Sequence, residues 1–199
     1  DDMERSLGLP LDVQTVFEPW NTDPDAVADL FDRLTAIWDA GRTPLVTWEP
    51  FTPTPAATPT DVLRRVVAGE FDDYLAEWAT ALSDWRTGPD GRVGTADDRR
   101  LYLRPMHEPN GDWYPWAPAG GDCDAETYVR SWHHVYRAVA DEGVTADHVL
   151  WIWAVNHVDV GEVTAEDLYP GDDAVDLVGV DGFNWGASQS WSEWRSPSA

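Results

Sequence analysis

The stretch from Leu101 to Trp116, LYLRPMHEPNGDWYPW, constrains the fold of this chain more than any other. Six strand-forming residues, 101–106, run directly into His107 and Glu108, and the Pro-Asn-Gly sequence at 109–111 then stops the strand and turns the backbone. The pattern therefore predicts that a histidine and a glutamate lie at the end of a buried strand.

Aromatic side chains crowd the loop after this strand, at Trp113, Tyr114 and Trp116. Flat aromatic faces pack against the apolar faces of sugar rings. A carboxyl group held among them is well placed to give a proton to a glycosidic oxygen. The pattern is equally compatible with a carbohydrate site that has Glu108 as the proton donor and with a surface loop in which the tryptophans only pack at the rim.

Strands and helices are predicted to alternate along the whole chain. Four further segments are typical of strands, and each is followed by polar or aromatic residues: 12–17, 44–48, 149–153 and 176–180. Helices are predicted between the strands and after the last one: from the cap signal Thr22-Asp23-Pro24 to Gly41, over 61–67, 72–85 and 125–142, as a short helix before residue 176, and from about Ser190.

This alternation predicts a parallel sheet with helices outside it and functional side chains at the carboxyl ends of the strands. No glycine-rich phosphate loop follows any strand, which argues against a nucleotide-binding sheet and favours a (β/α)8 barrel. A complete barrel has eight strands and typically about 250 residues. With five strands predicted in 199 residues, we expect either a fragment or a barrel whose other staves come from elsewhere.

The charge of the chain restricts its partners and its environment. There are 37 acidic residues against 13 basic ones, all of them arginine, and the formal net charge is −24. Such a surface repels phosphates and anionic lipids, so neither a nucleic acid nor a membrane is expected as a partner. Dense carboxylates without lysine are tolerable where concentrated salt screens their repulsion, which indicates a high-salt environment.

Two other features carry weaker signals. The loop at 88–98 loosely resembles a calcium loop, with Asp90, Asp97 and Asp98 as candidate ligands, but it lacks EF-hand spacing, and the favoured interpretation is a solvated acidic turn. Cys123 is the single cysteine and lacks metal-ligand spacing, so we predict no disulfide, no metal and no cofactor. The sequence starts at Asp1 without a methionine, and we therefore expect it to be a processed or excised piece.

The string RPMHEPNGDWYPW closely resembles the fourth-strand signature of glycoside hydrolase family 26, a barrel family of β-mannanases with some mixed-linkage β-glucanases. Three further stretches agree in order and spacing: PLVTWEP at 44–50, VLWIWAVN at 149–156 and YPGDDAVDLVGVDGFNWG at 169–186. The resemblance implies that residues 1–199 form one partial catalytic domain, an incomplete (β/α)8 TIM barrel with strands two to six.

The resemblance also implies a role for each residue of the signature. Glu108 would be the general acid/base, and His107 would contact the sugar and hold the catalytic carboxylates. Arg104 would support them from inside the barrel, or would pair with Glu49 in the barrel floor, and Trp113 would stack on the sugar or cap it. The remaining residues that the resemblance assigns to the substrate cleft are Asn110, Trp116, Phe183 and Trp185. By contrast, His133 and His134 are predicted on a helix away from the site.

The chain departs from the family pattern at two points. The nucleophile of the family is a glutamate on strand seven, which is not among the predicted strands. The candidates present are Glu18, Glu49 and Asp181, on strands to which the family gives other roles. In addition, Phe183 stands where many members have a tyrosine whose hydroxyl orients the nucleophile, and the loss of that hydroxyl would weaken the support of the site.

The expected function is that of a retaining endo-β-1,4-mannanase present as a fragment without the nucleophile strand and inactive alone. Its partner would be a β-mannan or related polysaccharide, and the full-length protein would be a secreted, extracellular monomer. The alternatives are a mixed-linkage β-glucanase or β-xylanase of the same family, a non-catalytic carbohydrate-binding relic, and an unrelated stand-alone fold.

The acidic composition generates a first prediction. We expect the helical circular dichroism of the protein to decrease as salt falls below about 1 M, because the repulsion between carboxylates is then no longer screened over short distances. A salt series in sodium chloride at neutral pH measures this effect. A spectrum that is the same in dilute buffer and in concentrated salt would contradict the prediction.

Overall fold

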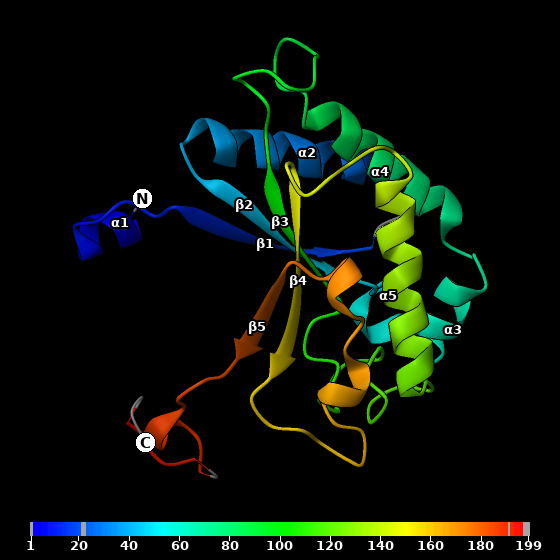
Figure 1. Ribbon diagram of the computed structural model, residues 1–199. Coiled ribbons are helices and arrows are strands. Elements are labelled where there is room, and N and C mark those ends of the chain that lie inside the picture. Colours follow the sequence, from blue (N-terminus) through cyan, green and yellow to red (C-terminus); the bar gives the residue numbers. More distant parts are fainter. Residues whose placement is uncertain (1, 21–22, 191, 197–199) are drawn as a thin grey trace.

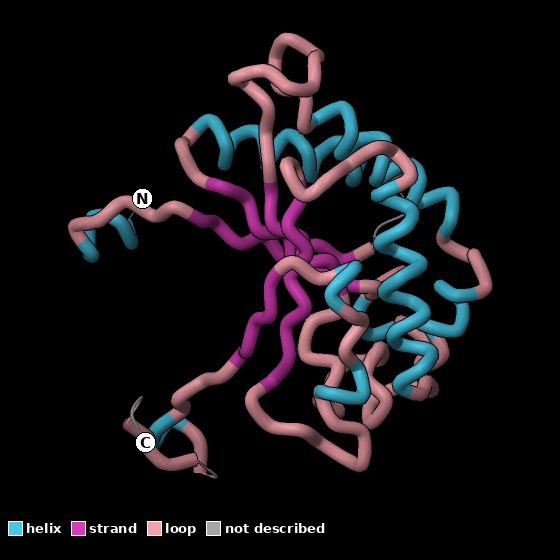
Figure 2. The backbone as a smooth tube through the Cα atoms, in the orientation of Figure 1, coloured by secondary structure: helices cyan, strands magenta, loops and turns pink. Residues whose placement is uncertain are grey.

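Five parallel strands form one curved sheet in chain order, β1-β2-β3-β4-β5 (Figure 2), in the computed structural model, which describes residues 2–20, 23–190 and 192–196. Each strand pairs in parallel with the next one along the chain. The strands are β1 (Val13–Pro19), β2 (Thr43–Glu49), β3 (Leu101–Pro105), β4 (Val149–Asn156) and β5 (Leu177–Asp181). The five predicted strands and their parallel arrangement are therefore confirmed.

The main helices cover the outer face of this sheet and leave the side between the two termini open (Figure 1). The helices are α1 (Asp2–Leu7), α2 (Pro24–Asp39), α3 (Val62–Val67), α4 (Asp72–Trp85) and α5 (Ala125–Ala140). Single 3-10 turns lie at η1 (Pro55–Ala57), η2 (Glu166–Leu168), η3 (Asp172–Ala174) and η4 (Gly186–Ser188). In the described ranges, no helix has the length and apolar character needed to cross a bilayer.

Local side-chain caps explain where the two longest helices begin. The carboxylate of Asp23 accepts a hydrogen bond from the backbone N–H of Asp25 (3.1 Å) at the start of α2, as the sequence predicts, whereas Thr22 lies outside the described residues. Asp124 accepts one from the N–H of Thr127 (2.8 Å) at the start of α5. These bonds satisfy donors that the first turn of a helix leaves without partners.

The prediction of a last helix from about Ser190 is wrong for the part of it that is described. Residues 192–196 are irregular, and the only helical turn nearby is η4. The side chain of Asn184 bonds both the N–H and the C=O of Arg195. The segment is thereby tied to the loop after β5, and the N–H of Ser192 bonds the carbonyl of Gln189 (3.1 Å). The short helix expected before residue 176 is instead the pair of single turns η2 and η3.

The core lies between the outer face of the sheet and the helices. Successive side chains of a strand point to opposite faces, and Trp48 of β2 points outward, where its ring stacks on Trp78 of α4 with ring centres 4.2 Å apart. Its indole N–H donates to the hydroxyl of Tyr74 (2.9 Å). Among the described residues, five tryptophans are fully buried: Trp20, Trp48, Trp78, Trp116 and Trp132.

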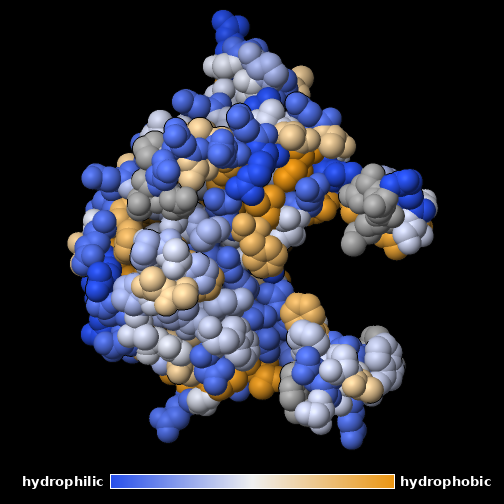
Figure 3. Space-filling model, turned by 180° about the vertical axis from the view of Figure 1, so that it is seen from behind, coloured by the Kyte–Doolittle hydropathy of each residue, from blue (hydrophilic) through white to orange (hydrophobic). Residues whose placement is uncertain are grey.

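The two edge strands of the sheet, β1 and β5, have exposed apolar side chains. Val13 and Phe17 are exposed on β1, as are Val178 and Val180 on β5. Seen from behind, the molecule is hollowed on one side, and hydrophobic side chains lie along part of the hollow (Figure 3). The five strands therefore form an arc with an open inner side, as in an incomplete (β/α)8 barrel.

The stacked tryptophans generate a prediction about stability. Replacing Trp78, which is 0% exposed, by alanine should lower the free energy of unfolding by about 3–5 kcal/mol because it leaves a cavity beneath β2. Trp194→Ala is the matched control, since the Trp194 side chain is 73% exposed and its loss should cost less than about 0.5 kcal/mol. Urea unfolding in constant salt measures both, and equal effects would contradict the assignment of Trp78 to the core.

Candidate active site

The segment after β3 leaves the strand conformation at two residues. Met106 and Glu108 have φ angles of 46° and 50°, in the left-handed region that side chains with a Cβ rarely adopt. Neighbouring groups hold this backbone in place: the N–H of Glu108 donates to the carbonyl of Ala154 (2.8 Å), and the hydroxyl of Tyr128 donates to that of Met106 (3.1 Å). Such backbone persists only where the surroundings fix it, and it is common at functional sites.

Both oxygens of the Glu108 carboxyl accept hydrogen bonds from side chains. Trp113 Nε1 donates to Oε2 (2.8 Å), and Asn156 Nδ2, at the end of β4, donates to Oε1 (3.1 Å). The Trp113 indole reaches this position because it lies over Gly111, where a Cβ would come within 2.4 Å of the ring. Glu108 is thus held between two strand ends, with only 7% of its surface exposed.

Asn110 lies beneath the cleft, whereas the resemblance places it on the cleft wall. It is 2% exposed, and its amide nitrogen donates to the carbonyl of Asn156 and to Asp159 Oδ1 (both 2.8 Å). Its amide oxygen accepts from the N–H of Asn156 (2.8 Å). Because every part of the amide is engaged by the loop after β4, Asn110 fixes that loop and does not face a ligand.

His107 is also buried, and no hydrogen bond joins it to the Glu108 carboxylate. Its Nε2 is hydrogen-bonded to the Tyr114 hydroxyl (2.9 Å), and its Nδ1 has no hydrogen-bond partner within the described part of the chain. Burial, assisted by the nearby charge of Arg104, lowers the pKa of His107 to about 3, so the imidazole is neutral at ordinary pH. Because His107 is buried, its ring offers no exposed surface for the predicted contact with a sugar.

Trp116 supports the site from below and does not line the cleft as predicted. It is fully buried, stacks on Tyr114 with ring centres 4.3 Å apart, and donates from Nε1 to the carbonyl of His107 (2.8 Å). After Pro105 the regular alternation of side chains stops, and for this reason spacing along the chain did not predict which of these rings face the solvent.

Arg104 lies on the inner face of the arc, where the sequence places it. It pairs with Asp181 at the end of β5 (3.1 Å) and also donates to Thr47 of β2 (2.8 Å). The alternative partner, Glu49, is close enough to feel the charge of Arg104 but forms no ion pair with it within the described residues. The pairing with Asp181 was missed because the two residues are far apart in sequence.

Glu49 is a half-buried carboxyl at the end of β2. Desolvation by burial raises its pKa from 4.5 to about 7, against a smaller lowering effect of Arg104. Its neighbour Tyr114 has a pKa raised to about 12, first by burial and then by the negative charges of Glu108, Glu49 and Asp181. The Tyr114 hydroxyl therefore lies within electrostatic range of three acidic side chains and one arginine.

A cavity of about 1010 Å³ opens beside the Glu108 carboxyl. Its walls carry exposed aromatic rings, Trp113 on the β3 side and Phe183 and Trp185 on the β5 side. The rings of Phe183 and Trp185 lie 5.5 Å apart. The lining residues that the sequence analysis did not assign to the site include Asn156, His157, Ser192, Glu193 and Arg195. The position of Asn156 at a strand end was the signal that could have placed it here.

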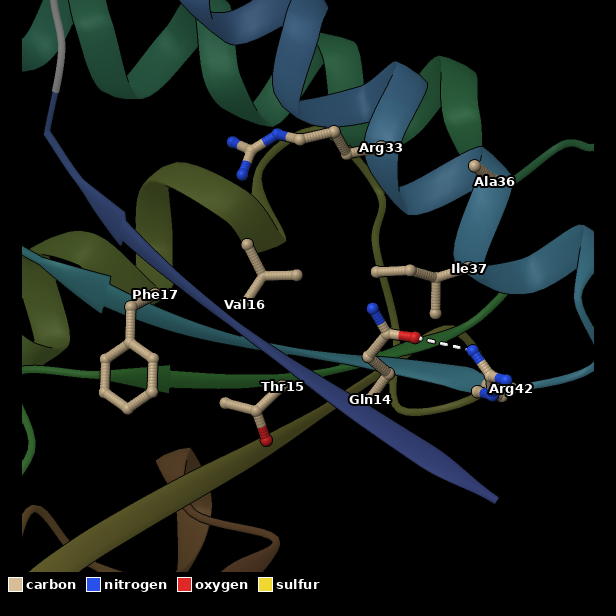
Figure 4. Close-up of a pocket in the computed structure, with 8 residues that line it drawn as sticks. All are labelled: Gln14, Thr15, Val16, Phe17, Arg33, Ala36, Ile37 and Arg42. Carbon is tan, nitrogen blue, oxygen red and sulfur yellow. Dashed lines mark hydrogen bonds between the residues drawn. The ribbon is translucent and has the colours of Figure 1, made fainter. Parts of the chain in front are cut away.

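A second cavity, of about 550 Å³, lies at the edge of the sheet formed by β1 (Figure 4). Gln14 and Val16 point from β1 toward α2, whereas Thr15 and Phe17 point to the other side. Gln14 accepts a hydrogen bond from Arg42 (2.9 Å). On the same side of β1, Glu18 pairs with Arg33 of α2, so this candidate carboxylate does not face Glu108.

The acidic loop at 88–98 uses its carboxylates internally. Asp97 accepts from the N–H of Asp90 (3.0 Å), and Asp98 accepts from the N–H of Gly94 (2.7 Å). Hydrogen bonds lower the pKa of both carboxyl groups: for Asp97 first the bond from the Thr95 hydroxyl and then that from Asp90, and for Asp98 first the bond from Gly94. Within the described ranges, no three His, Cys, Asp or Glu side chains are grouped to hold a metal ion. His134 lies on α5, where it pairs with Asp72 (2.7 Å), away from the cleft.

The geometry combines a carboxyl group fixed by two donors with aromatic walls on either side of it. A carboxyl in such a place can transfer a proton to or from a bound molecule, and the exposed indole rings can stack on sugar rings.

Comparison with known proteins gives consistent results. The family model for glycosyl hydrolase family 26 matches residues 66–195. Endoglucanase H of Acetivibrio thermocellus is 33% identical over 193 residues, which is 95% of this chain and 19% of that protein. Mannan endo-1,4-beta-mannosidase of Bacillus subtilis strain 168 is 32% identical over 88 residues, 42% of this chain and 23% of that enzyme.

A solved modular endo-beta-1,4-mannanase from Cellulomonas fimi superposes with a TM-score of 0.64 at 24% identity, over 82% of this chain and 37% of that one. This likeness shows that the five-stranded arc has the barrel fold. The chain thus spans about a fifth of the length of the two sequence relatives and less than half of that structure.

The raised pKa of Glu49 generates a prediction about pH and stability. The folded protein holds this proton up to about pH 7 and the unfolded chain only to about 4.5, so stability should fall as pH rises between these values and then level off. Glu49→Gln should reduce the fall in the free energy of unfolding over this pH range by about 1–2 kcal/mol, a figure that allows for solvent screening of a half-buried group.

Urea unfolding at several pH values from 4.5 to 8, in constant salt, measures the slope. Glu77→Gln is the matched control, because Glu77 is exposed on α4 and its loss should leave the slope as it is. A slope that Glu49→Gln does not reduce would mean that this carboxyl is hydrated in the folded protein.

Proposed function

The chain belongs to glycosyl hydrolase family 26, and on this basis we propose that it forms the acid/base part of a retaining endo-β-1,4-mannanase. The observation that carries the proposal is the Glu108 carboxyl, fixed by Trp113 and Asn156 beside a cleft with exposed aromatic rings. The mannan substrate is supported by the B. subtilis and C. fimi relatives, whose names describe mannan-hydrolysing enzymes.

In the proposed reaction, Glu108 protonates the leaving glycosidic oxygen and later removes a proton from the attacking water. A retaining mechanism needs a second carboxylate about 5–5.5 Å away as nucleophile. Asp181 is paired with Arg104, and Glu18 is paired with Arg33 of α2. Following the resemblance to the family, we assign the nucleophile to strand seven of the family barrel, outside the five strands described, so that this chain supplies a part of the catalytic unit.

A second candidate substrate is a β-glucan. Endoglucanase H aligns with 95% of this chain, whereas the B. subtilis mannosidase aligns with 42%. Selectivity between mannan and glucan depends on contacts to the sugar 2-hydroxyl, which the motifs of this chain do not fix. The long alignment therefore supports β-glucanase activity as the alternative to mannanase activity.

The proposed substrate and the charge of the chain together support a location outside the cell in concentrated salt. Long polysaccharides are degraded where they are met, outside the membrane, and the net charge of −24 favours a medium in which carboxylates are screened. The sodium chloride series described above tests the salt requirement, and detection of the protein in culture medium tests the location.

The proposal predicts a specific loss of activity. A polypeptide that carries residues 1–199 within a complete barrel should release reducing sugar from β-1,4-mannan or a β-glucan, and Glu108→Gln should lower the rate at least about 100-fold, because the proton donor is lost. A panel of mannan, mixed-linkage glucan and xylan identifies the substrate. Glu77→Gln, on the outer face of α4, should retain full activity.

Residues 1–199 alone should release no sugar. Release that Glu108→Gln abolishes would make a carboxylate of this chain the nucleophile and contradict its assignment to strand seven. If the complete barrel binds these polysaccharides without hydrolysing any, the protein is a carbohydrate-binding relic and the proposed activity is wrong.

A further inference from the structure

The side chain of Asn156 points from the end of β4 to one oxygen of the Glu108 carboxyl, and the backbone of Asn156 is held by Asn110. We propose that Asn156 is the positioning residue of the acid/base: it holds Oε1 of Glu108, so that Oε2 is the oxygen that carries the transferred proton. This inference rests on the proposed function, because it concerns how Glu108 acts on a glycosidic bond.

The orientation of the Asn156 amide is fixed from three directions. Its backbone N–H donates to Asn110 Oδ1 and its carbonyl accepts from Asn110 Nδ2 (both 2.8 Å), which locks the main chain. Its side-chain Oδ1 accepts from the N–H of Val158 (3.1 Å). Since the oxygen of the amide is occupied there, the nitrogen must face Glu108, and Asn156 can act toward that carboxyl only as a donor.

The donor on the other oxygen is held far less firmly. Trp113 is 46% exposed on the cleft wall, and its indole N–H is the group that bonds Oε2. A sugar that enters the cleft can displace this indole or stack on it, whereas no ligand reaches the buried Asn110 behind Asn156. Substrate binding would therefore free Oε2 and leave Oε1 bonded.

The difference between the two oxygens of the Glu108 carboxyl suits the proton transfer. A protonated carboxyl carries its hydrogen on one oxygen, and an N–H donor aimed at that oxygen competes with the proton. With Trp113 displaced, the proton on Oε2 passes to the glycosidic oxygen as the bond between that oxygen and the sugar carbon breaks. The bonding electrons leave with the oxygen, the nucleophile carboxylate bonds the carbon, and the resulting Glu108 carboxylate stays bonded to Asn156 through Oε1.

The first test compares two leaving groups in the complete barrel. A sugar alkoxide needs protonation and 2,4-dinitrophenolate does not. Asn156→Ala should lower kcat/KM on the polysaccharide about 100-fold, and on the matching dinitrophenyl glycoside by less than about threefold. Asn156→Asp keeps the acceptor for Val158 and loses the donor, so it should show the same selectivity if Asn156→Ala folds poorly. Equal losses on both substrates would mean a merely structural role and overturn the inference.

The second test does not depend on activity. In residues 1–199, the Trp113 indole N–H proton, assigned by its loss in Trp113→Phe, should lie downfield in the nuclear magnetic resonance spectrum because it bonds a carboxylate. In Asn156→Ala it should move toward its position in Glu108→Gln, because the carboxyl is no longer held. Gln14→Ala, which removes an amide near α2, should leave it in place.

The two tests separate failure of the inference from failure of the proposed function. An indole resonance that Asn156→Ala leaves at the wild-type position would overturn the positioning role, whatever the activity. If the complete barrel hydrolyses no polysaccharide, the proposed function fails, and the indole resonance alone then decides whether Asn156 holds the carboxyl.

Discussion

The ion pair between Arg104 and Asp181 ties β3 to β5 across the inner face of the arc, passing over β4. Charges inside a protein are stable only when paired and hydrogen-bonded, and here Thr47 provides an additional acceptor for the guanidinium. The pair fixes the separation of the two strand ends, one followed by Glu108 and the other by Phe183 and Trp185. The width of the cleft between them thus depends on this contact together with the ladders that join β3 and β5 through β4.

Most of the fold could be predicted from sequence because its signals are local. The Asp23 cap and the five runs of strand-forming residues each specify their own segment, and parallel order then follows from alternation. The site was predicted less completely. Side-chain alternation ends at Pro105, where Met106 and Glu108 turn left-handed, so spacing no longer tells which residues point inward. For this reason the burial of Asn110 and Trp116 could not be predicted from spacing, and only their tertiary contacts show it.

The excess of tryptophan, 13 in 199 residues, serves two purposes. Several rings form the core between sheet and helices, where the stacked pair Trp48 and Trp78 is completely enclosed. Others, such as Trp113 and Trp185, face the cleft and remain half exposed. A count of aromatic residues could suggest both uses, but it could not assign them, because burial depends on which face of an element the ring occupies.

The left-handed backbone at Glu108 has an evolutionary consequence. A residue with a Cβ, placed before a proline, is strained there, and glycine would relieve the strain. Loss of the carboxyl would, however, also remove the acceptor of the Trp113 and Asn156 side-chain donors. The two effects on stability oppose each other, so relief of backbone strain alone gives a lineage no reason to replace this glutamate.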